Sequence, residues 1–156
     1  MGAPLRIETK VIAAFPGTGK THFFKNNPNR SIDSDSSEFS WIKDKSGANT
    51  KLRNPEFPAN YIKHIRENIG KVEFIFVSSH DVVRDALVQS GIEFTLVYPN
   101  VLLKNEYLKR FQERKSPQGF IDLLHKNWEQ WTFECHLQEH CNKIELESGQ
   151  FISNII

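Results

Sequence analysis

The chain has 156 residues, which is enough for one compact domain and too short for two. Hydrophobic residues make up 38% of it and charged residues 25%, a balance typical of a folded globular protein. Its 20 Lys and Arg residues face 19 Asp and Glu residues, so the net charge is +1. This near-neutral balance does not favour a nucleic acid as the main partner, although it leaves room for a local basic patch.

Three sequence features predict a cytoplasmic protein without membrane contact. The longest apolar runs, 11–15 and 74–77, are far too short to cross a bilayer. The N-terminus holds no apolar signal core, which argues against secretion, and Arg6 stands where a myristoylation site would carry Ser or Thr. The only two cysteines, Cys135 and Cys141, are expected to be reduced thiols rather than part of a disulfide scaffold.

Strand-like apolar runs alternate with helical patterns along the chain. In order, the patterns predict a strand over 10–15, a helix over 21–26, a strand over 31–33, and then a Ser-rich, charged stretch up to residue 54. There follow a helix over 58–69, a strand over 72–78, a helix over 81–89, a strand over 92–98 and a helix over 101–115. A helix from 117 to about 139, a strand over 143–146 and a closing helix over 151–156 complete the chain. This alternation predicts one parallel α/β domain, with a five-stranded sheet and helices on both of its faces.

The strongest functional signal lies between the first strand and the first helix, in the segment Ala14-Phe15-Pro16-Gly17-Thr18-Gly19-Lys20-Thr21. It fits the phosphate-loop pattern, with Ala at the first position in place of Gly. The two glycines let backbone N–H groups curl around a polyphosphate, the lysine can reach the β- and γ-phosphates, and the final threonine can ligate Mg²⁺. A glycine-rich turn that only caps a helix is the disfavoured alternative. We therefore expect ATP and Mg²⁺ as cofactors, bound by Pro16, Gly17, Thr18, Gly19, Lys20 and Thr21.

Other classes of nucleotide-binding protein fit the sequence less well. Motor ATPases carry an acidic residue at the end of a second apolar strand, whereas the candidate strands here run into Ser78-Ser79-His80 and Tyr98-Pro99-Asn100. A GTPase would show an Asn-Lys-x-Asp motif after a later strand, and the sequence has none. These absences favour a small kinase.

Four segments, in order, resemble the small P-loop kinases, the superfamily of nucleoside monophosphate, shikimate and gluconate kinases. The loop at 14–21 is the first, and Ile32-Asp33-Ser34-Asp35 is similar to the Asp-x-Asp of shikimate and gluconate kinases. Val77-Ser78-Ser79-His80 with Val83-Arg84-Asp85-Ala86-Leu87 resembles gluconate kinases, and Tyr107-Leu108-Lys109-Arg110-Phe111-Gln112-Glu113-Arg114 resembles the Arg-bearing lid of the group. Shikimate kinases carry Gly-Gly-Gly, and adenylate kinases Asp-Gly-x-Pro-Arg, where this chain has Ser78-Ser79-His80. The pattern is similar overall to phage-type and bacterial nucleotide kinases.

The resemblance implies a P-loop NTPase-type three-layer sandwich, with an acceptor-binding insert at about 36–69 and a lid at about 104–116. It implies catalytic roles for Lys20, Asp35, Arg110 and Arg114. Asp35 would contact the acceptor and take its proton, while Asp33 would join Thr21 at the Mg²⁺ ion. The alternatives are that one aspartate only caps the following helix and that the two arginines form a solvated basic face.

The acceptor-binding candidates are Asp35, Trp41, Arg53, Ser78, Ser79 and Arg84. Trp41 would stack on a base or sugar and Arg53 would meet an acceptor phosphate, although aromatic residues at such spacing are more often part of the core. The segment Cys135-His136-x-x-x-His140-Cys141 looks like a metal cluster, but its cysteines do not fit one tetrahedral site with the histidines. The end of an amphipathic helix is the favoured interpretation.

These features predict ATP- and Mg²⁺-dependent phosphoryl transfer to a small acceptor, with a nucleotide or nucleoside as first choice. A sugar acid or other metabolite hydroxyl, and a modified base or an end in DNA, are the alternative acceptors. A nucleotide-binding regulatory module is the non-enzymatic alternative.

Overall fold

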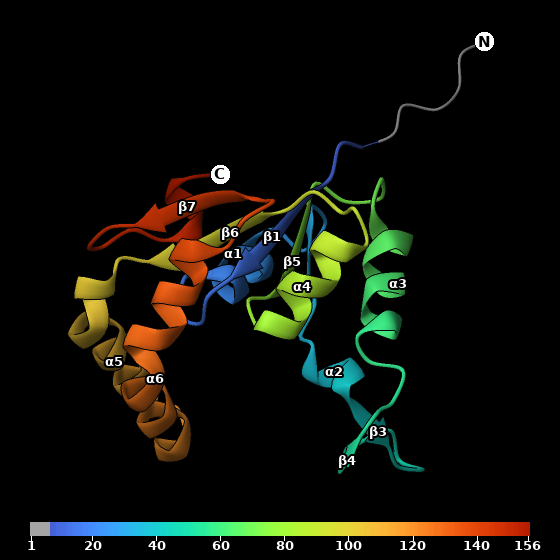
Figure 1. Ribbon diagram of the computed structural model, residues 1–156, viewed down its shortest axis with the longest axis horizontal. Helices are drawn as coiled ribbons and strands as arrows, with labels where there is room; N and C mark the ends of the chain where they lie inside the picture. The colour runs from blue at the N-terminus through green and yellow to red at the C-terminus, as the bar shows by residue number, and fades with distance from the viewer. Residues whose placement is uncertain (1–6) are drawn as a thin grey trace.

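A parallel five-stranded sheet forms the centre of the computed structural model, which describes residues 7–156 (Figure 1). Its strands lie in the order β2-β5-β1-β6-β7, and every neighbouring pair is parallel. They are β1 (Lys10–Ala14), β2 (Ser31–Asp33), β5 (Phe74–Ser78), β6 (Thr95–Pro99) and β7 (Asn142–Leu146). The predicted α/β class and five-stranded parallel sheet are confirmed. The predictions drawn from residues 1–6, on secretion and myristoylation, lie outside the described residues.

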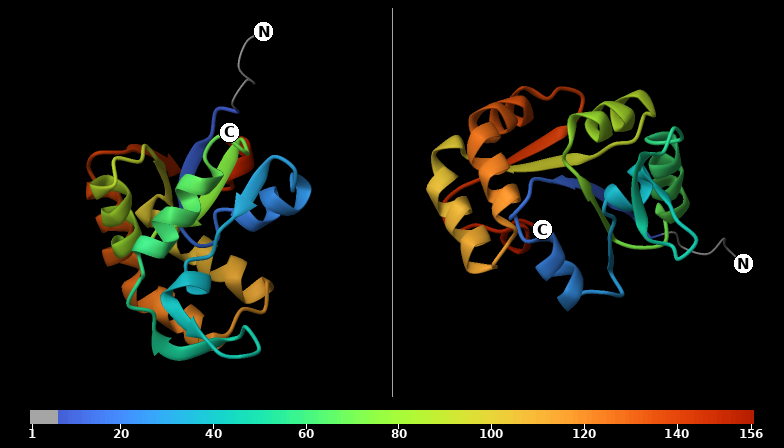
Figure 2. Two further views of the ribbon diagram at one scale, coloured as in Figure 1. Left: turned by 90° about the vertical axis from the view of Figure 1, so that its right-hand side faces the viewer. Right: turned by 90° about the horizontal axis from the view of Figure 1, so that it is seen from below.

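Helices cover both faces of this sheet, as predicted (Figure 2, right). One face is covered by α3 (Ala59–Asn68), α4 (Asp81–Gln89), α5 (Lys104–Glu113) and α6 (Gln118–Leu137), with the short 3₁₀ helix η1 (Val101–Leu103) leading into α5. The other face is covered by α1 (Lys20–Asn26) and by the 3₁₀ turn η2 (Ile152–Asn154). Alternate residues of β1 explain this arrangement, since Val11 and Ala13 face the first layer and Ile12 and Ala14 the second.

The closing segment differs from its predicted form. A helix was expected over 151–156, but only the 3₁₀ turn η2 is present, and Ile152 is fully buried against the α1 face of the sheet. Within the chain from residue 7 to its end, no helix is both long and apolar enough to cross a membrane.

The Ser-rich stretch before residue 54 contains an unpredicted hairpin. After the short helix α2 (Ser37–Ser40), β3 (Trp41–Lys43) pairs antiparallel with β4 (Asn49–Arg53). Asp44 builds the turn, because its Oδ1 accepts hydrogen bonds from the backbone N–H groups of Ser46 and Ala48 at 2.8 and 3.1 Å. Figure 1 shows the hairpin extending beyond the same edge of the sheet as the connection between α5 and α6.

Candidate functional site

The loop between β1 and α1 lies at the carboxyl edge of the sheet, where the chain connections diverge. From β1 the chain runs through α1 to β2, beyond β5, whereas from β6 it runs through α5 and α6 to β7 on the opposite side. Open α/β sheets bind ligands outside the strand ends at such a switch point. Residues 15–19, which we call the glycine loop, therefore occupy the position in the fold best suited to a ligand.

The glycine loop needs both of its glycines. Gly17 and Gly19 have φ angles of 83° and 96°, in the left-handed region that residues with a side chain rarely adopt. A Cβ atom on Gly17 would lie 3.0 Å from the Phe111 ring, so the loop also packs closely on α5. Thr18 is buried and its Oγ1 donates a hydrogen bond to the Phe15 carbonyl at 2.7 Å. These contacts fix the loop without using the first residues of α1.

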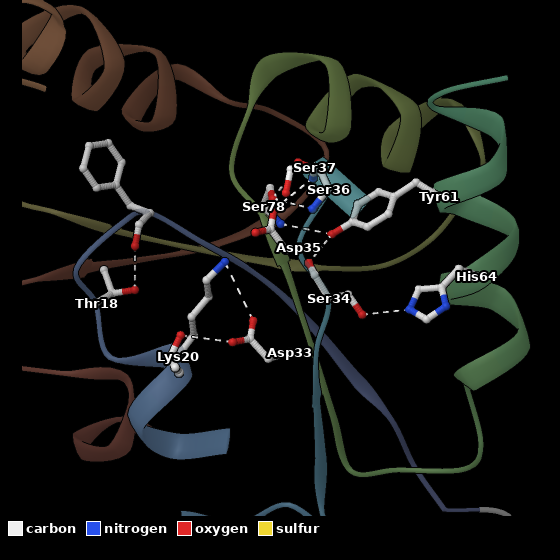
Figure 3. Close-up of polar contacts among 12 residues, drawn as sticks. Thr18, Lys20, Asp33, Ser34, Asp35, Ser36, Ser37, Tyr61, His64 and Ser78 are labelled. Atoms are coloured by element: carbon white, nitrogen blue, oxygen red, sulfur yellow. Dashed lines mark hydrogen bonds and ion pairs between the residues drawn. The ribbon is translucent and has the colours of Figure 1, made fainter. Parts of the chain in front are cut away.

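Lys20 and Thr21, at the start of α1, meet the end of β2. Figure 3 shows the Lys20 side chain pointing toward Asp33. Thr21 Oγ1 donates a hydrogen bond to Asp33 Oδ2 at 3.0 Å, and Lys20 Nζ lies 3.9 Å from Asp33 Oδ1. Asp33 is partly buried, with 18% of its side chain exposed. A hydroxyl and a carboxylate oxygen thus stand together beside an ammonium group, a donor set of the hard oxygen type that Mg²⁺ prefers.

Asp35 lies just beyond, at the start of α2. Its Oδ1 accepts a hydrogen bond from the backbone N–H of Ser37, the first residue of α2, at 2.9 Å, whereas the N-cap position of this helix is occupied by Ser36. The side chain is exposed, and within residues 7–156 its Oδ2 forms no hydrogen bond or ion pair. One oxygen of Asp35 is used in the fold, and the other remains accessible.

Ser78 and Tyr61 hold the segment that carries Asp33 and Asp35. Ser78 is buried, and its Oγ donates to Ser36 Oγ at 2.9 Å. The buried hydroxyl of Tyr61 donates to the Ser34 carbonyl at 2.6 Å and accepts from the Ser78 N–H at 3.3 Å. Burial raises the pKa of Tyr61, so its hydroxyl keeps its proton. This role could not be predicted from the sequence, because Tyr61 occupies a core position on an amphipathic helix.

Ser79 and Arg84 meet each other rather than Asp35. Arg84 is buried, and its Nε donates to the Ser79 carbonyl at 2.9 Å. Its other nitrogens reach the far end of α6, with Nη1 2.6 Å from Gln138 Oε1 and Nη2 3.6 Å from Glu134 Oε2. Arg84 therefore links α4 to the end of α6.

His80 is a residue near the site that the sequence analysis did not single out. It follows β5 directly and lies within electrostatic reach of Lys20 and Asp35. His80 is exposed overall, but partial burial of its ring disfavours the charged form, and Lys20 adds positive charge, so the pKa of His80 is lowered.

Arg110, predicted to belong to a lid, contacts the glycine loop. Its Nη1 donates to the Gly17 carbonyl at 2.9 Å, and its Nη2 lies 3.0 Å from Glu106 Oε2. The guanidinium carbon lies 4.3 Å from the Tyr107 ring centre and 4.0 Å from that of Phe151. Arg110 thus joins α5, the glycine loop and residues 147–156, which we call the C-terminal segment.

Arg114 lies apart from these contacts. It caps the end of α5, is exposed, and its guanidinium carbon is 5.3 Å from the Phe111 ring centre. Of the two predicted lid arginines, Arg110 contacts the glycine loop, and the contact of Arg114 is with the Phe111 ring.

The C-terminal segment also lies against the glycine loop. The Ile152 N–H donates to the Thr18 carbonyl at 2.9 Å. A Cβ atom on Gly19 would lie 3.1 Å from the Phe151 ring. No local sequence pattern signals this contact, because it joins residues more than 130 positions apart.

Trp41 and Arg53 lie together at the base of the hairpin. The Arg53 guanidinium carbon is 4.2 Å from the Trp41 ring centre. Phe39, by contrast, packs on Tyr61 and His64, with ring centres 5.1 and 4.8 Å apart.

The Cys135–Cys141 segment is spread over the end of α6 and the start of β7. Cys135 is buried, and His136 Nδ1 is hydrogen-bonded to the Tyr98 hydroxyl at 3.2 Å. In the part of the chain that the structure describes, no three His, Cys, Asp or Glu side chains gather as a metal site would require.

Comparison with protein-family models and with curated proteins finds no match to this chain.

Proposed function

We propose that this protein is a phosphotransferase of the small P-loop kinase type, which moves the γ-phosphate of ATP to a small, nucleotide-like acceptor. The observation that carries the proposal is the meeting of Lys20, Thr21 and Asp33 beside the glycine loop, at the carboxyl ends of β1 and β2. Polyphosphate binding calls for a cation and open backbone N–H groups at a helix start, and both are present.

Each residue of this group has a defined role in the proposal. The ammonium group of Lys20 neutralises the β- and γ-phosphates, and Thr21 and Asp33 hold Mg²⁺ directly or through water. Bound Mg²⁺ supplies neutralisation of the charge on the phosphate oxygens. Lys20 already lies 3.9 Å from Asp33, so the two charges stabilise one another before any ligand binds.

Asp35 orients the acceptor in this proposal. The acceptor hydroxyl oxygen forms a bond to the γ-phosphorus while the bond from phosphorus to the β–γ bridging oxygen breaks, and ADP leaves with that oxygen. The hydroxyl proton passes to the exposed Oδ2 of Asp35, which accepts no hydrogen bond from any residue between 7 and 156. A phosphate acceptor is already ionised and needs from Asp35 only orientation.

The test is nucleotide binding and turnover with matched variants. Calorimetry with a non-hydrolysable ATP analogue and Mg²⁺ should show binding to the native protein and to the control Lys25→Gln, an exposed lysine of the same helix. Lys20→Gln should lose binding and ADP release. Equal affinity in both variants would contradict the assignment, and analogue binding without ADP release over a broad acceptor panel would favour a regulatory module.

A further inference from the structure

Positive charge is concentrated at the carboxyl edge of the sheet, despite the near-neutral total. The hairpin (residues 41–53) and the α5–α6 corner (residues 109–115) together hold eight of the chain's 20 Lys and Arg residues and two of its 19 Asp and Glu residues. Figure 1 shows both segments extending beyond the same edge of the sheet, where the glycine loop also lies, and the left view of Figure 2 agrees. The rest of the chain therefore carries a net negative charge.

Several of these cations have no opposing carboxylate. Lys43 pairs with Glu38 at 2.7 Å, Lys109 with Glu113 at 3.8 Å and Arg110 with Glu106 at 3.0 Å. The others form no ion pair with any residue between 7 and 156, and they are Lys45, Lys51, Arg53, Arg114 and Lys115. A surface with uncompensated cations attracts an anionic partner.

The hairpin is too long to serve a single phosphate group. Arg53 lies at its base, on the Trp41 ring, and Lys45 lies in the turn at its tip. At the ordinary rise of a strand, four residues separate the tip from the base by about 13 Å. Cations spaced in this way along a strand, with Arg53 held on the Trp41 ring, suit successive phosphates of a nucleic acid backbone better than a single phosphate.

The hairpin also offers apolar and aromatic surface for bases. The Trp41 side chain is partly exposed, Leu52 is 65% exposed and Ile42 is 40% exposed. Cations interleaved with an aromatic ring are the usual means of binding single strands without sequence preference.

From these observations we propose that the phosphate acceptor is the end of a single-stranded nucleic acid, and that the hairpin binds its backbone. This inference rests on the proposed function for the ATP site and the transfer step, and it replaces the small free acceptor with the terminal nucleotide of a strand. The terminal hydroxyl of the strand is the oxygen that attacks the γ-phosphorus, with ADP leaving and the proton passing to Asp35. The hairpin begins six residues after Asp35 on the chain, so a strand lying along it reaches the candidate site with its end.

The test compares two double variants of the whole chain. Lys45→Gln with Lys51→Gln removes two unpaired hairpin cations. Lys10→Gln with Lys71→Gln removes two exposed lysines next to the amino ends of β1 and β5, at the opposite edge of the sheet. The probe is a twelve-nucleotide oligothymidylate, labelled at either end in separate samples and followed by fluorescence anisotropy at several salt concentrations.

The hairpin variant should bind on the order of tenfold more weakly than the native protein at low salt, and its salt slope should be flatter by about 1.4, or 0.7 for each lost phosphate contact. The control variant should retain the native affinity and slope. Thymidine monophosphate should bind much more weakly than the oligonucleotide, and label from γ-labelled ATP should enter the oligonucleotide.

Equal losses in both variants, equal affinity for thymidine monophosphate, or tighter binding of a blunt duplex would each overturn the inference. Binding of the ATP analogue separates this failure from that of the proposed function. If the analogue binds and ADP is released with another acceptor, only the inference fails. If the analogue does not bind, the proposed function fails with it.

Discussion

Asp33 connects the two functional side chains at the start of α1 in the candidate nucleotide site, because it contacts both Thr21 and Lys20. Asn at this position keeps the size and the hydrogen bond from Thr21 but removes the negative charge. Asp33→Asn should weaken Mg²⁺-dependent binding of an ATP analogue by about 10- to 100-fold, the range seen when metal-site partners are lost. Binding without Mg²⁺ should change little, because Lys20 and the loop N–H groups remain.

Calorimetry with and without Mg²⁺ measures this difference. Asp85→Asn, an exposed aspartate on α4, makes the same chemical change away from the site and serves as its control. A loss of affinity that is the same with and without Mg²⁺ would mean that Asp33 acts only by placing Lys20.

Tyr61 anchors the segment that carries Asp33 and Asp35, since its hydroxyl donates to the Ser34 carbonyl and accepts from the Ser78 N–H. Tyr61→Phe leaves both backbone groups buried without that partner, so the free energy of unfolding should fall by about 1–3 kcal/mol. The KM for the acceptor should rise, because the segment that carries Asp35 loses its anchor. Denaturant unfolding and acceptor kinetics measure the two effects.

Tyr107 provides the matched control for that substitution. Its buried hydroxyl lies near Arg110 but has no well-formed hydrogen bond within residues 7–156. Tyr107→Phe should therefore change the free energy of unfolding very little. A Tyr61→Phe protein as stable as Tyr107→Phe would show that the hydroxyl bridge contributes nothing.

At the scale of elements, α5 and the C-terminal segment are joined through Glu106. Its carboxylate accepts hydrogen bonds from Ser148 Oγ at 2.5 Å and from the Gly149 N–H at 3.2 Å, and it pairs with Arg110. The Ser148 hydrogen bond is the main reason why the pKa of Glu106 is lowered, with smaller contributions from Gly149 and Arg110. Because the folded pKa lies below the unfolded value, the carboxylate stabilises the fold above pH of about 4.5, and this contribution is lost as the pH falls through the folded pKa.

Glu106→Gln should therefore melt at a lower temperature than the native protein at pH 6, and the difference should shrink as the pH falls below about 4.5. Thermal unfolding between pH 6 and pH 3.5 measures it. Glu113→Gln, an exposed glutamate on the same helix, should show no such pH-dependent difference. A difference for Glu106→Gln that persists at the lowest pH would contradict an electrostatic origin.

A variant of Arg110 can distinguish two roles for α5, namely support of the glycine loop and a lid that acts on the transferred phosphate. Its hydrogen bond to the Gly17 carbonyl places it as a support of the glycine loop, so Arg110→Ala should weaken binding of an ATP analogue. A lid arginine that acts on the transferred phosphate would instead leave binding intact and lower the transfer rate by about 10²–10³-fold. Calorimetry and single-turnover transfer on one variant decide between them, with the exposed Arg114→Ala as control.

The elements that the sequence predicted well are those with a strong apolar period. The buried strand β5 and the amphipathic helix α3 lie within one or two residues of their expected bounds. The hairpin was missed because β3 and β4 do not pack against the hydrophobic core, and their sequences show no alternation of apolar and polar residues. The contacts of Tyr61 with Ser34 and of Ile152 with Thr18 join distant segments, and no local pattern records such pairs.

At the scale of the whole molecule, the hairpin is an appendage to the sheet rather than part of its core. The backbone N–H of Asn54 donates to the Ser40 carbonyl at 2.9 Å, so the chain already closes on itself where the hairpin begins and ends. Residues 41–53 contribute nothing to the two buried clusters on the faces of the sheet. A short loop that joins Ser40 to Asn54 should therefore leave the fold in place.

Replacement of residues 41–53 by Gly-Gly tests whether the hairpin serves oligonucleotide binding alone, while the rest of the chain folds and binds the ATP analogue without it. The melting temperature and the affinity for an ATP analogue should stay close to native values, because neither the core clusters nor the glycine loop includes a residue of the hairpin. Binding of the oligothymidylate should fall to the level of thymidine monophosphate, because the backbone contacts are gone while Asp35 remains. Melting curves, calorimetry and anisotropy on the one variant measure all three. Loss of ATP-analogue binding in a stably folded variant would instead place the hairpin in the nucleotide site, and unchanged oligonucleotide binding would assign the nucleic acid surface to the α5–α6 corner alone.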